Sequence, residues 1–554
     1  MTQSGVLDLM TFDISAALIA LLWAILTGWR VYRLARFHQM EEYKFNRFAA
    51  WWFAQRERFL PRQAVNAGAV TVGLCIVLGE GGAVLPTLIA LVGGGVAAWL
   101  PAEVEIKKAY VPTARAKRLL VAAWVIESLV AALLIFWAAS AFESDSVRIG
   151  LAAVMGLAVW FLSPVWLILG NLAMWPLEEA SRQRFVRMAR TTLRRIHPTV
   201  IGITGSYGKT TTKNFVAELL GGRFRTYATP KSFNTMLGVS RAINADLTDH
   251  YALDYFVVEM GAYFPGEIKR ICGLTPPRIG IVTEVGPMHL ERFKTLERTT
   301  IAKYELIAAL PPDGVGIFNW DNTYVRGMMA KNHPATRIGV SKTADPANPP
   351  AEVRLIASEV RETLDGLAFR VTDTQSKQTE AFDVPVSGEH NVTNLLCAIA
   401  VGLHEGMTLK ELAARAKSLS PSEARLVTQA TVGGVTVIND AYSANPVGAR
   451  SALRVLGLHT SGRRVLITPG MVELGTLMES ENRALGEFAA GYATDVILVG
   501  LERTRPLAEG LKAAGFPPDK VLAVERLSEA ILWTQTHLAS GDTVLYLNDL
   551  PDSY

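Results

Sequence analysis

A glycine-containing loop carries the residues whose types and spacing most directly suggest chemistry: Gly205, Ser206, Tyr207, Gly208, Lys209, Thr210 and Thr211. The apolar run 199–204 before it predicts a buried strand, and residues 213–220 after it predict a helix. In that setting the glycines let backbone N–H groups face an anion at a helix N-terminus. The lysine could then meet the β- and γ-phosphates of a nucleotide, and the first threonine hydroxyl could ligate Mg²⁺. The loop therefore predicts nucleotide binding. A strict Walker motif would have glycine where Ile203 stands, so a chance glycine turn is the alternative.

Two further side chains could complete a phosphate and metal site beside this loop. Glu259 follows the apolar run 255–258, so we expect it at the carboxyl edge of a sheet, where ligands bind in α/β folds. His289 follows a Gly-Pro turn and could ligate a second Mg²⁺ or orient a phosphate. The ordinary alternatives are a solvated glutamate at a strand end and a hydrogen-bonded histidine in a loop.

Three residues farther along the chain could bind the nucleoside. Asn391 and Asn394 stand three residues apart and would share one face of a helix. Their amides could contact the adenine or the phosphates, or they could simply cap the helix. Asp440 closely follows the apolar run 435–438 and could accept hydrogen bonds from the ribose hydroxyls.

Short motifs recur in order over residues 197–550 and together resemble those of the Mur ligase family, in particular its branch that adds D-alanyl-D-alanine to a muramyl tripeptide. They are TGSYGKTTT (204–212), VVEMGA (257–262), MHLE (288–291), AK (302–303), NWDN (319–322), GEHNVTN (388–394), RL (425–426) and DAYSANP (440–446). Each motif alone is weak evidence. So many in the family's order are not expected by chance.

The resemblance implies ATP and Mg²⁺ as cofactors and assigns further roles by position. Lys303, which by itself would pass for a surface lysine, matches the lysine that these ligases carbamylate, and Arg425 would reach the γ-phosphate when the C-terminal domain closes. The implied reaction converts a carboxylate and ATP to an acyl phosphate, which an amine attacks to form an amide, leaving ADP and phosphate. The catalytic candidates are therefore Lys209, Lys303, His289 and Arg425, and the metal candidates are Thr210, Glu259, His289 and Lys303.

Residues 1–176 hold most of the long apolar runs of a chain that is 50% apolar and has a mean hydropathy of +0.23. The runs that approach the roughly 20 residues of a membrane helix are 12–29, 64–78, 83–100, 119–142 and 149–175. The second is short, contains glycine and could re-enter instead of spanning. Basic residues gather in the segments 30–63, 101–118 and 182–195, which the positive-inside rule places in the cytoplasm. The five runs then predict a multi-pass protein of a bacterial-type plasma membrane, with the N-terminus outside and the catalytic domains cytoplasmic.

The expected architecture is an all-α membrane domain (1–176), a basic connector helix (177–196), a central α/β P-loop ATPase domain (197–420) and a Rossmann-like C-terminal domain (421–554). Alternating strands and helices predict parallel sheets. A net charge of +4 is too small to suggest nucleic acid as a partner. The three cysteines are far apart and show no spacing typical of zinc sites or disulfide frameworks.

Several departures from the family bear on the substrate. Membrane helices stand where Mur ligases have a soluble domain that holds the uridine nucleotide. The family's G-N-x-N-N stretch keeps only Asn234, the aspartate of its GDMLELG motif is missing at 469–475, and residues 547–550 read LNDL where the muramyl ligase has a KGSR that touches substrate. We therefore expect a membrane-anchored amide-bond ligase whose carboxylate or amine substrate is lipid-linked, as in a cell-wall or glycan precursor.

Other readings of the chain stay open. It could be a tethered D-alanyl-D-alanine-adding muramyl ligase, or an ATPase domain that powers a transporter or exporter. Five helices with few intramembrane polar residues would make a poor conduction path. A non-catalytic scaffold would not need to keep the whole set of candidate catalytic and metal residues. A homodimer through the membrane helices is compatible with the sequence but not required by it.

Overall fold

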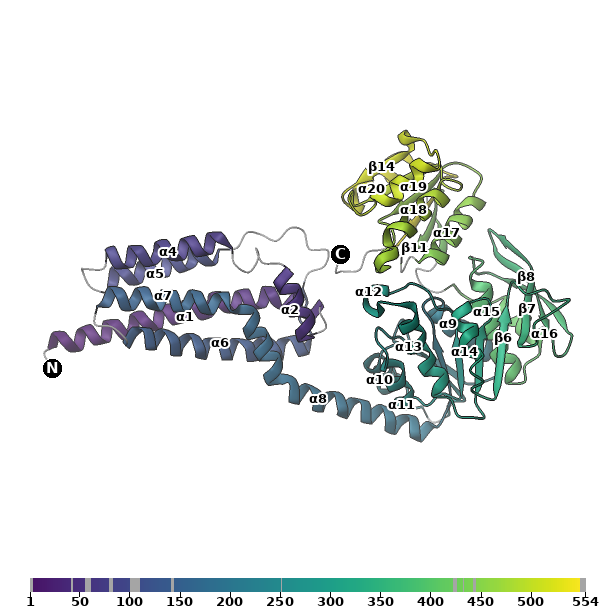
Figure 1. The fold of residues 1–554 in the computed structure, drawn as a ribbon, viewed down its shortest axis with the longest axis horizontal. Helices are drawn as coiled ribbons and strands as arrows, with labels where there is room; N and C mark the ends of the chain where they lie inside the picture. Colours follow the sequence, from purple (N-terminus) through teal and green to yellow (C-terminus); the bar gives the residue numbers. More distant parts are fainter. Residues whose placement is uncertain are drawn as a thin grey trace. The chain divides into compact units, whose positions relative to one another are not determined.

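The computed structural model describes residues 3–40, 43–54, 61–78, 83–99, 110–140, 144–250, 252–421, 426–431, 433–441 and 445–548. The chain falls into two compact units that divide between Gln183 and Arg184. The first is helical, and the second holds two β-sheets with helices packed on them (Figure 1). The predicted succession of a helical domain and α/β domains is confirmed.

The first unit contains α1 (Gln3–Met40), α2 (Phe45–Ala54), α4 (Arg62–Val77), α5 (Val84–Ala98), α6 (Ala114–Ser140), α7 (Asp145–Phe161) and the start of α8 (Ser163–Ile196). Its interior is filled by small apolar and aromatic side chains such as Ala123, Trp23 and Trp160. Helices α1 and α6 contain apolar stretches of 27 and 25 residues, Ile14–Met40 and Ala114–Ala138, each long enough to cross a membrane.

The other three predicted spans need correction. The runs 64–78 and 83–100 form α4 and α5, which have 16 and 15 residues. At 1.5 Å per residue they reach only about 24 and 22 Å, against a hydrocarbon core of roughly 30 Å. The run 149–175 is divided between α7 and α8, which meet at a bend of 62°. Within its described residues the chain therefore has two helices long enough to span, or three spans if the bent pair counts as one.

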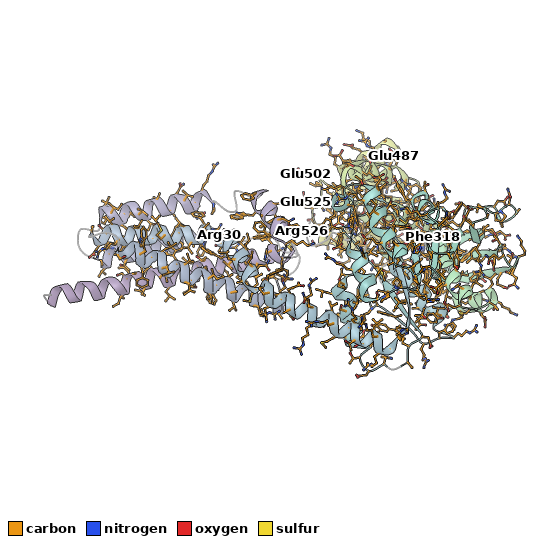
Figure 2. The ribbon with its side chains drawn as sticks, turned by 60° about the horizontal axis from the view of Figure 1, so that its bottom comes forward. Arg30, Phe318, Glu487, Glu502, Glu525 and Arg526 are labelled. Atoms are coloured by element: carbon orange, nitrogen blue, oxygen red, sulfur yellow. The ribbon has the colours of Figure 1, made fainter. Side chains whose placement is uncertain are left out.

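A proline explains the bend. Pro164 lacks an N–H group, and in a continuous helix its ring would clash with the carbonyl group of Trp160. That carbonyl oxygen instead accepts hydrogen bonds from Ser163 Oγ at 2.5 Å and from Arg30 Nη1 at 3.0 Å. The Arg30 guanidinium lies 3.7 Å from the centroid of the Trp160 ring, inside the helical unit (Figure 2). Arg30 and Ser163 thus donate to the carbonyl oxygen that Pro164, which lacks an N–H group, cannot serve.

A nine-stranded sheet forms the core of the central domain, in the order β2-β3-β1-β4-β5-β6-β7-β8-β9. Its strands are β1 (Thr199–Thr204), β2 (Thr226–Ala228), β3 (Tyr255–Glu259), β4 (Ile279–Val282), β5 (Val315–Asn319), β6 (Thr336–Ser341), β7 (Val353–Thr363), β8 (Gly366–Asp373) and β9 (Thr379–Val384). All pairings from β2 to β7 are parallel, as predicted. The pairings β7–β8 and β8–β9 are antiparallel, because short turns join these strands where a parallel pair would need a crossover helix.

Helices cover both faces of this sheet (Figure 1). On one face, α9 (Lys209–Leu220), α15 (Asn391–His404) and α16 (Leu409–Ala416) pack against strand residues such as Ile201 and Val257. On the other, α10 (Met236–Asp246), α11 (Glu267–Leu274) and α13 (Leu296–Ala308) pack against residues such as Val200 and Phe256. Leu193 of α8 joins this second cluster. Because α8 runs without a break from Ser163 to Ile196, the predicted connector 177–196 is its last part and not a separate helix. Two short helices, α12 (Leu290–Phe293) and α14 (Thr323–Met329), follow β4 and β5.

The C-terminal domain has a six-stranded sheet in the order β10-β11-β15-β12-β13-β14. Its elements are β10 (Val427–Ala430), β11 (Thr436–Asp440), α17 (Pro446–Leu458), β12 (Arg464–Thr468), α18 (Met478–Ala489), β13 (Asp495–Val499), α19 (Arg505–Ala513), β14 (Val521–Val524), α20 (Leu527–His537) and β15 (Thr543–Leu547). Strands β11–β15 pair in parallel, as the alternation of strands and helices predicts. The structure adds β10 as an antiparallel edge strand.

The topology brings the first group of candidate residues to one sheet edge. Strand β1 lies between β3 and β4, and all three run in parallel. The loop after β1, Glu259 at the end of β3 and Thr283 after β4 therefore emerge side by side. This is the carboxyl edge at which α/β sheets bind ligands.

Candidate functional site

The loop between β1 and α9 is held in place by its neighbours. The Ser206 backbone N–H donates to Glu284 O at 2.6 Å, and the Ser206 hydroxyl donates to Gly286 O at 3.1 Å. Gly208 has a φ of 78° and immediately precedes α9, and a Cβ atom there would lie 2.2 Å from Asn394 Oδ1. Only glycine fits both the left-handed conformation and the close approach. The loop is therefore fixed at a helix N-terminus, which is the geometry that receives phosphate groups.

Two lysines converge on this loop. Lys209 Nζ donates to Gly205 O at 2.8 Å and to Ser206 O at 3.2 Å. Lys303 Nζ, from α13, donates to the same Gly205 oxygen at 2.9 Å and is buried. Burial, followed by the positive charge of Lys209, lowers the pKa of Lys303 well below the ordinary lysine value. Lys303 is thus an amine whose surroundings favour its neutral form, not the surface lysine that its sequence context suggests.

The candidate metal residues Thr210 and Glu259 are in direct contact. The Thr210 hydroxyl donates to Glu259 Oε2 at 2.8 Å, and Asn234 Nδ2 donates to Glu259 Oε1 at 3.0 Å. Lys213 Nζ lies 3.9 Å from Glu259 Oε2 and donates to the backbone oxygen of Thr229 at 2.6 Å. Lys213 was not among the predicted site residues. Its signal is its spacing, since it follows Lys209 by four residues and so shares the loop-facing side of α9.

The His289 side chain points toward the C-terminal domain. Its Nδ1 atom contacts Glu473 Oε2, from the loop that follows β12, and its ring packs edge-on against Tyr263 with centroids 4.8 Å apart. Burial lowers the pKa of His289, although Glu473 opposes the shift, and the hydrogen bond with His289 lowers the pKa of Glu473. Glu473 lies in the stretch 469–475 that resembles a family motif, but it was not among the predicted site residues. The candidate metal residues thus lie in separate contacts: Thr210 with Glu259, Lys303 with the loop, and His289 with Glu473.

The amides of α15 lie against α9. Asn394 Nδ2 donates to Asn391 Oδ1 at 2.9 Å, and the Thr212 hydroxyl donates to Asn394 Oδ1 at 3.1 Å. Asn391 Nδ2 in turn donates to Ser387 O at 2.8 Å. The two asparagines do share a helix face, and the Thr212–Asn394 hydrogen bond ties that face to α9, the helix that follows the phosphate loop.

A pocket joins these groups to the C-terminal domain. Its lining includes Tyr207, Gly208, Thr211, Glu284, Asn391, Asn394, Asp440 and Asn445. The Asp440 carboxylate accepts a hydrogen bond from the Leu426 backbone N–H at 3.2 Å. Arg425 lies outside the described residues, as do residues 442–444 of the motif that follows Asp440. The pocket has the loop and a helix N-terminus at one wall and a strand-end carboxylate at another, which suits a nucleotide.

The residues present also fit a magnesium ion. Among the described residues no three His, Cys, Asp or Glu side chains are grouped as a metal cluster. Mg²⁺ does not require one, because it is commonly held by one or two protein oxygens together with substrate phosphates and water. The Thr210 hydroxyl and the Glu259 carboxylate, in contact beside the phosphate loop, offer such a pair.

Two protein-family models match the chain. The Mur ligase middle domain matches residues 203–402, and the Mur ligase, glutamate ligase domain matches residues 424–547. The UDP-N-acetylmuramoyl-tripeptide–D-alanyl-D-alanine ligase of Mycobacterium leprae is 32% identical over 375 residues, which cover 63% of this chain and 70% of that protein. The enzyme of the same name from Bacillus subtilis is 26% identical over 361 residues, covering 65% of this chain and 75% of that protein.

Solved structures agree with these matches. MurF from Acinetobacter baumannii superposes with a TM-score of 0.56 at 25% identity, covering 66% of this chain and 77% of that one. MurF ligase from Thermotoga maritima, solved in complex with ADP, superposes with a TM-score of 0.57 at 23% identity, covering 67% of this chain and 80% of that one. Both family models lie after residue 202, and the helical unit lies outside them. The chain belongs to the Mur ligase family, whose members are ATP-dependent ligases.

Proposed function

We propose that the chain is a membrane-anchored ligase that forms an amide through an acyl phosphate, on a lipid-linked or membrane-associated cell-wall or glycan precursor. The observation that carries the catalytic part is the convergence of Lys209 and Lys303 on Gly205 O beside the Thr210–Glu259 contact. Because members of this family are ligases, the exporter and scaffold alternatives are set aside.

The phosphate loop would bind the β- and γ-phosphates of ATP. The Lys209 ammonium group, now held by loop carbonyls, would turn to the phosphates and reduce their repulsion with the substrate carboxylate. Mg²⁺ held by Thr210 and Glu259 would neutralise charge on the transferring phosphoryl group. Positioning and charge are the main requirements of phosphoryl transfer, and no covalent participation by the protein is needed.

Lys303 is suited to become a carbamate. Its neutral amine could attack CO₂, giving a carbamate and releasing one proton. The new group would place two oxygens and a negative charge beside the loop, where Lys209 lies close enough to lower the pKa of Lys303. A carbamate would thus form an ion pair with the Lys209 ammonium group and supply oxygens of the kind that Mg²⁺ prefers.

The nucleoside would lie across the pocket. Asn391 and Asn394 would contact the adenine or the phosphates, and Asp440 would accept hydrogen bonds from the ribose. Arg425 would approach the γ-phosphate from the C-terminal domain. His289, whose surroundings favour the neutral imidazole, could orient the phosphate or ligate a metal through Nε2 while Glu473 holds Nδ1.

Two contacts between the central and C-terminal domains support a closing motion that would exclude water from the acyl phosphate. One is His289 with Glu473. In the other, Glu389 accepts Lys342 Nζ at 2.6 Å on one oxygen and Arg454 Nη1 at 3.1 Å on the other. Glu389 stands two residues before Asn391, so this bridge would link domain closure to the nucleotide pocket.

Membrane anchoring would use α1, α6 and the bent pair α7–α8. If α4 and α5 form a re-entrant hairpin, the chain crosses the membrane three times. Three is odd, as is the predicted five, so the N-terminus would still lie outside and the catalytic domains in the cytoplasm. The basic segments 30–63, 101–118 and 182–195 would then all face the cytoplasm. A homodimer through these helices stays a prediction.

A tethered D-alanyl-D-alanine-adding ligase is the second candidate, favoured by the similarity to UDP-N-acetylmuramoyl-tripeptide–D-alanyl-D-alanine ligases. Phosphate release by the full-length protein separates the two. With ATP and Mg²⁺, we expect release that needs both a membrane-lipid extract and one amino acid or dipeptide, and none from Lys209→Ala. Release with soluble UDP-muramyl tripeptide and D-alanyl-D-alanine, without lipid, would establish the second candidate instead.

A further inference from the structure

The helical unit contains an apolar pocket of about 500 Å³ between α1, α4, α5 and α7. Protein interiors rarely keep voids much larger than a water molecule. An apolar cavity of about 150 Å³ is already enough to bind benzene. Ile76 lines the pocket and is 52% exposed, so the pocket opens on the outer surface of the bundle. This volume and opening suit an elongated ligand that enters from the surrounding medium.

The pocket does not result from loose packing throughout the unit. A Cβ atom on Gly68 would lie 2.3 Å from Leu157 Cδ2, so α4 and α7 touch there. A Cβ atom on Gly93 would lie 2.0 Å from Thr71 Oγ1, so α4 and α5 touch there. Gly73 lines the pocket at an exposed position, where a Cβ atom would meet nothing within 4 Å. The close helix contacts at Gly68 and Gly93 therefore flank a pocket that is open at Gly73.

The lining selects an uncharged hydrocarbon. Of the described side chains that line the pocket, Thr71 and Trp23 alone carry polar atoms, and none is charged. The Thr71 hydroxyl already donates to Ala67 O at 2.7 Å. Trp23 is 2% exposed, and its indole Nε1 has no hydrogen-bond partner within the described chain. Buried tryptophan N–H groups normally find a partner, so the Trp23 indole departs from the usual pattern. The lining offers no charged partner to a ligand.

We propose that this pocket holds the hydrocarbon chain of the lipid that carries the ligase's substrate. The inference rests on the proposed function. The two family matches account for residues 203–402 and 424–547, and the pocket lies in the helical unit outside them. With the chain seated in the helical unit, a headgroup at the membrane surface would be presented to the catalytic unit as a tethered reactant, and its binding would be in effect intramolecular.

A matched pair of glycine variants tests the pocket. Gly73→Phe would place an aromatic ring in the open space. Gly95→Phe makes the same change on α5 at a position that also has nothing within 4 Å of a Cβ atom and does not line the pocket. The full-length proteins are placed in nanodiscs of phosphatidylethanolamine and phosphatidylglycerol. Two photoreactive probes are compared: a long-chain prenyl phosphate and a phosphatidylcholine, each with a diazirine in its hydrocarbon chain. Cross-linked peptides are mapped by mass spectrometry.

The expected result is prenyl phosphate cross-linking to peptides of α4 and α5 that falls about tenfold in Gly73→Phe, since losing two buried methylene contacts already changes a binding constant by that factor. Gly95→Phe should label like the wild type. Equal labelling of the two variants, or phosphatidylcholine labelling as strong as that by the prenyl phosphate, would overturn the inference. The proposed function is judged separately by phosphate release from the wild type. Lipid-dependent phosphate release together with equal cross-linking of the two variants would refute the pocket proposal alone. Phosphate release with the soluble precursor and no lipid would refute both the pocket proposal and the proposed lipid-linked substrate.

Discussion

Glu473 of the C-terminal domain contacts the Nδ1 atom of His289 in the central domain, and both residues have left-handed backbone conformations, with φ values of 62° and 57°. Non-glycine residues in that region cost about 1–3 kcal/mol each and tend to cluster at functional sites. The Leu290 backbone N–H also donates to Glu473 O at 3.1 Å. Two strained loops thus meet at one side-chain pair beside the predicted phosphate site.

Glu473→Ala should reduce kcat by about 10- to 100-fold, the effect typical of removing a group that orients a catalytic or metal-binding histidine. Glu473→Gln, which keeps a hydrogen-bond acceptor for Nδ1–H, should recover part of that loss. Steady-state phosphate release gives kcat and KM. Glu479→Gln, an exposed residue at the start of α18, is the control and should behave like the wild type. Equal kcat for Glu473→Ala and the control would show that the contact is structural only.

Thr210→Ala and Glu259→Gln should each raise the Mg²⁺ concentration needed for half-maximal activity by about 10- to 100-fold. Because the two side chains share a hydrogen bond of 2.8 Å, the double variant should lose much less than the sum of the single losses in free energy. Magnesium titrations of the four proteins measure this coupling. Strictly additive losses would argue against a shared site.

The pH dependence of folding stability, compared between the wild type and Lys303→Met, tests whether the buried amine is neutral. Burial holds the pKa of Lys303 in the folded protein well below the ordinary lysine value, so between the two pKa values the unfolded chain binds more protons than the folded one. Folding stability therefore rises with pH in that window, with a slope of at most about 1.4 kcal/mol per pH unit for one group. In CO₂-free buffer the Tm of the wild type should gain on that of Lys303→Met as the pH rises toward the ordinary lysine pKa. Lys410→Met, at an exposed position, should show no such trend, and a constant difference for Lys303→Met would refute the assignment.

Glu389→Gln and Arg454→Ala should each raise the KM for ATP about two- to fivefold, because partly exposed ion pairs contribute roughly 0.2–1 kcal/mol. The two changes should be non-additive, since Glu389 and Arg454 are 3.1 Å apart. Arg483→Ala, which removes an ion pair within the C-terminal domain, is the matched control. An unchanged KM for ATP in both variants would mean that the contact between Glu389 and Arg454 does not affect nucleotide binding.

Much of the arrangement around the loop could be predicted because its signals are local. The loop 205–211, the strand-end Glu259 and the spaced asparagines each lie within a few residues of the pattern that identifies them. The parallel order of β1, β3 and β4 then brings the loop and Glu259 together, as expected from an α/β sheet.

Other features depend on contacts that no local pattern contains. Glu473 and His289 are 184 residues apart, and only the docking of two domains makes them partners. Lys303 is buried only because the folded chain packs around it. Its sequence context does not contain that packing and suggests a solvated side chain. The predicted number of membrane spans is wrong for a different reason. The runs 64–78 and 83–100 form helices of only 16 and 15 residues, which are too short to span. The run 149–175 is also divided, because Pro164 has no N–H group to continue the helix.

The acyl phosphate is the central claim, and oxygen transfer tests it most directly. Carboxylate groups of the lipid extract are labelled with ¹⁸O, and the full-length protein is supplied with ATP, Mg²⁺ and the amine that supports turnover. If a carboxylate oxygen attacks the γ-phosphate and the amine then displaces phosphate, one ¹⁸O atom must leave with each phosphate released, and Lys209→Ala should release none. Labelled phosphate that requires the amine for turnover is the predicted result. Amide formation with unlabelled phosphate would contradict the account.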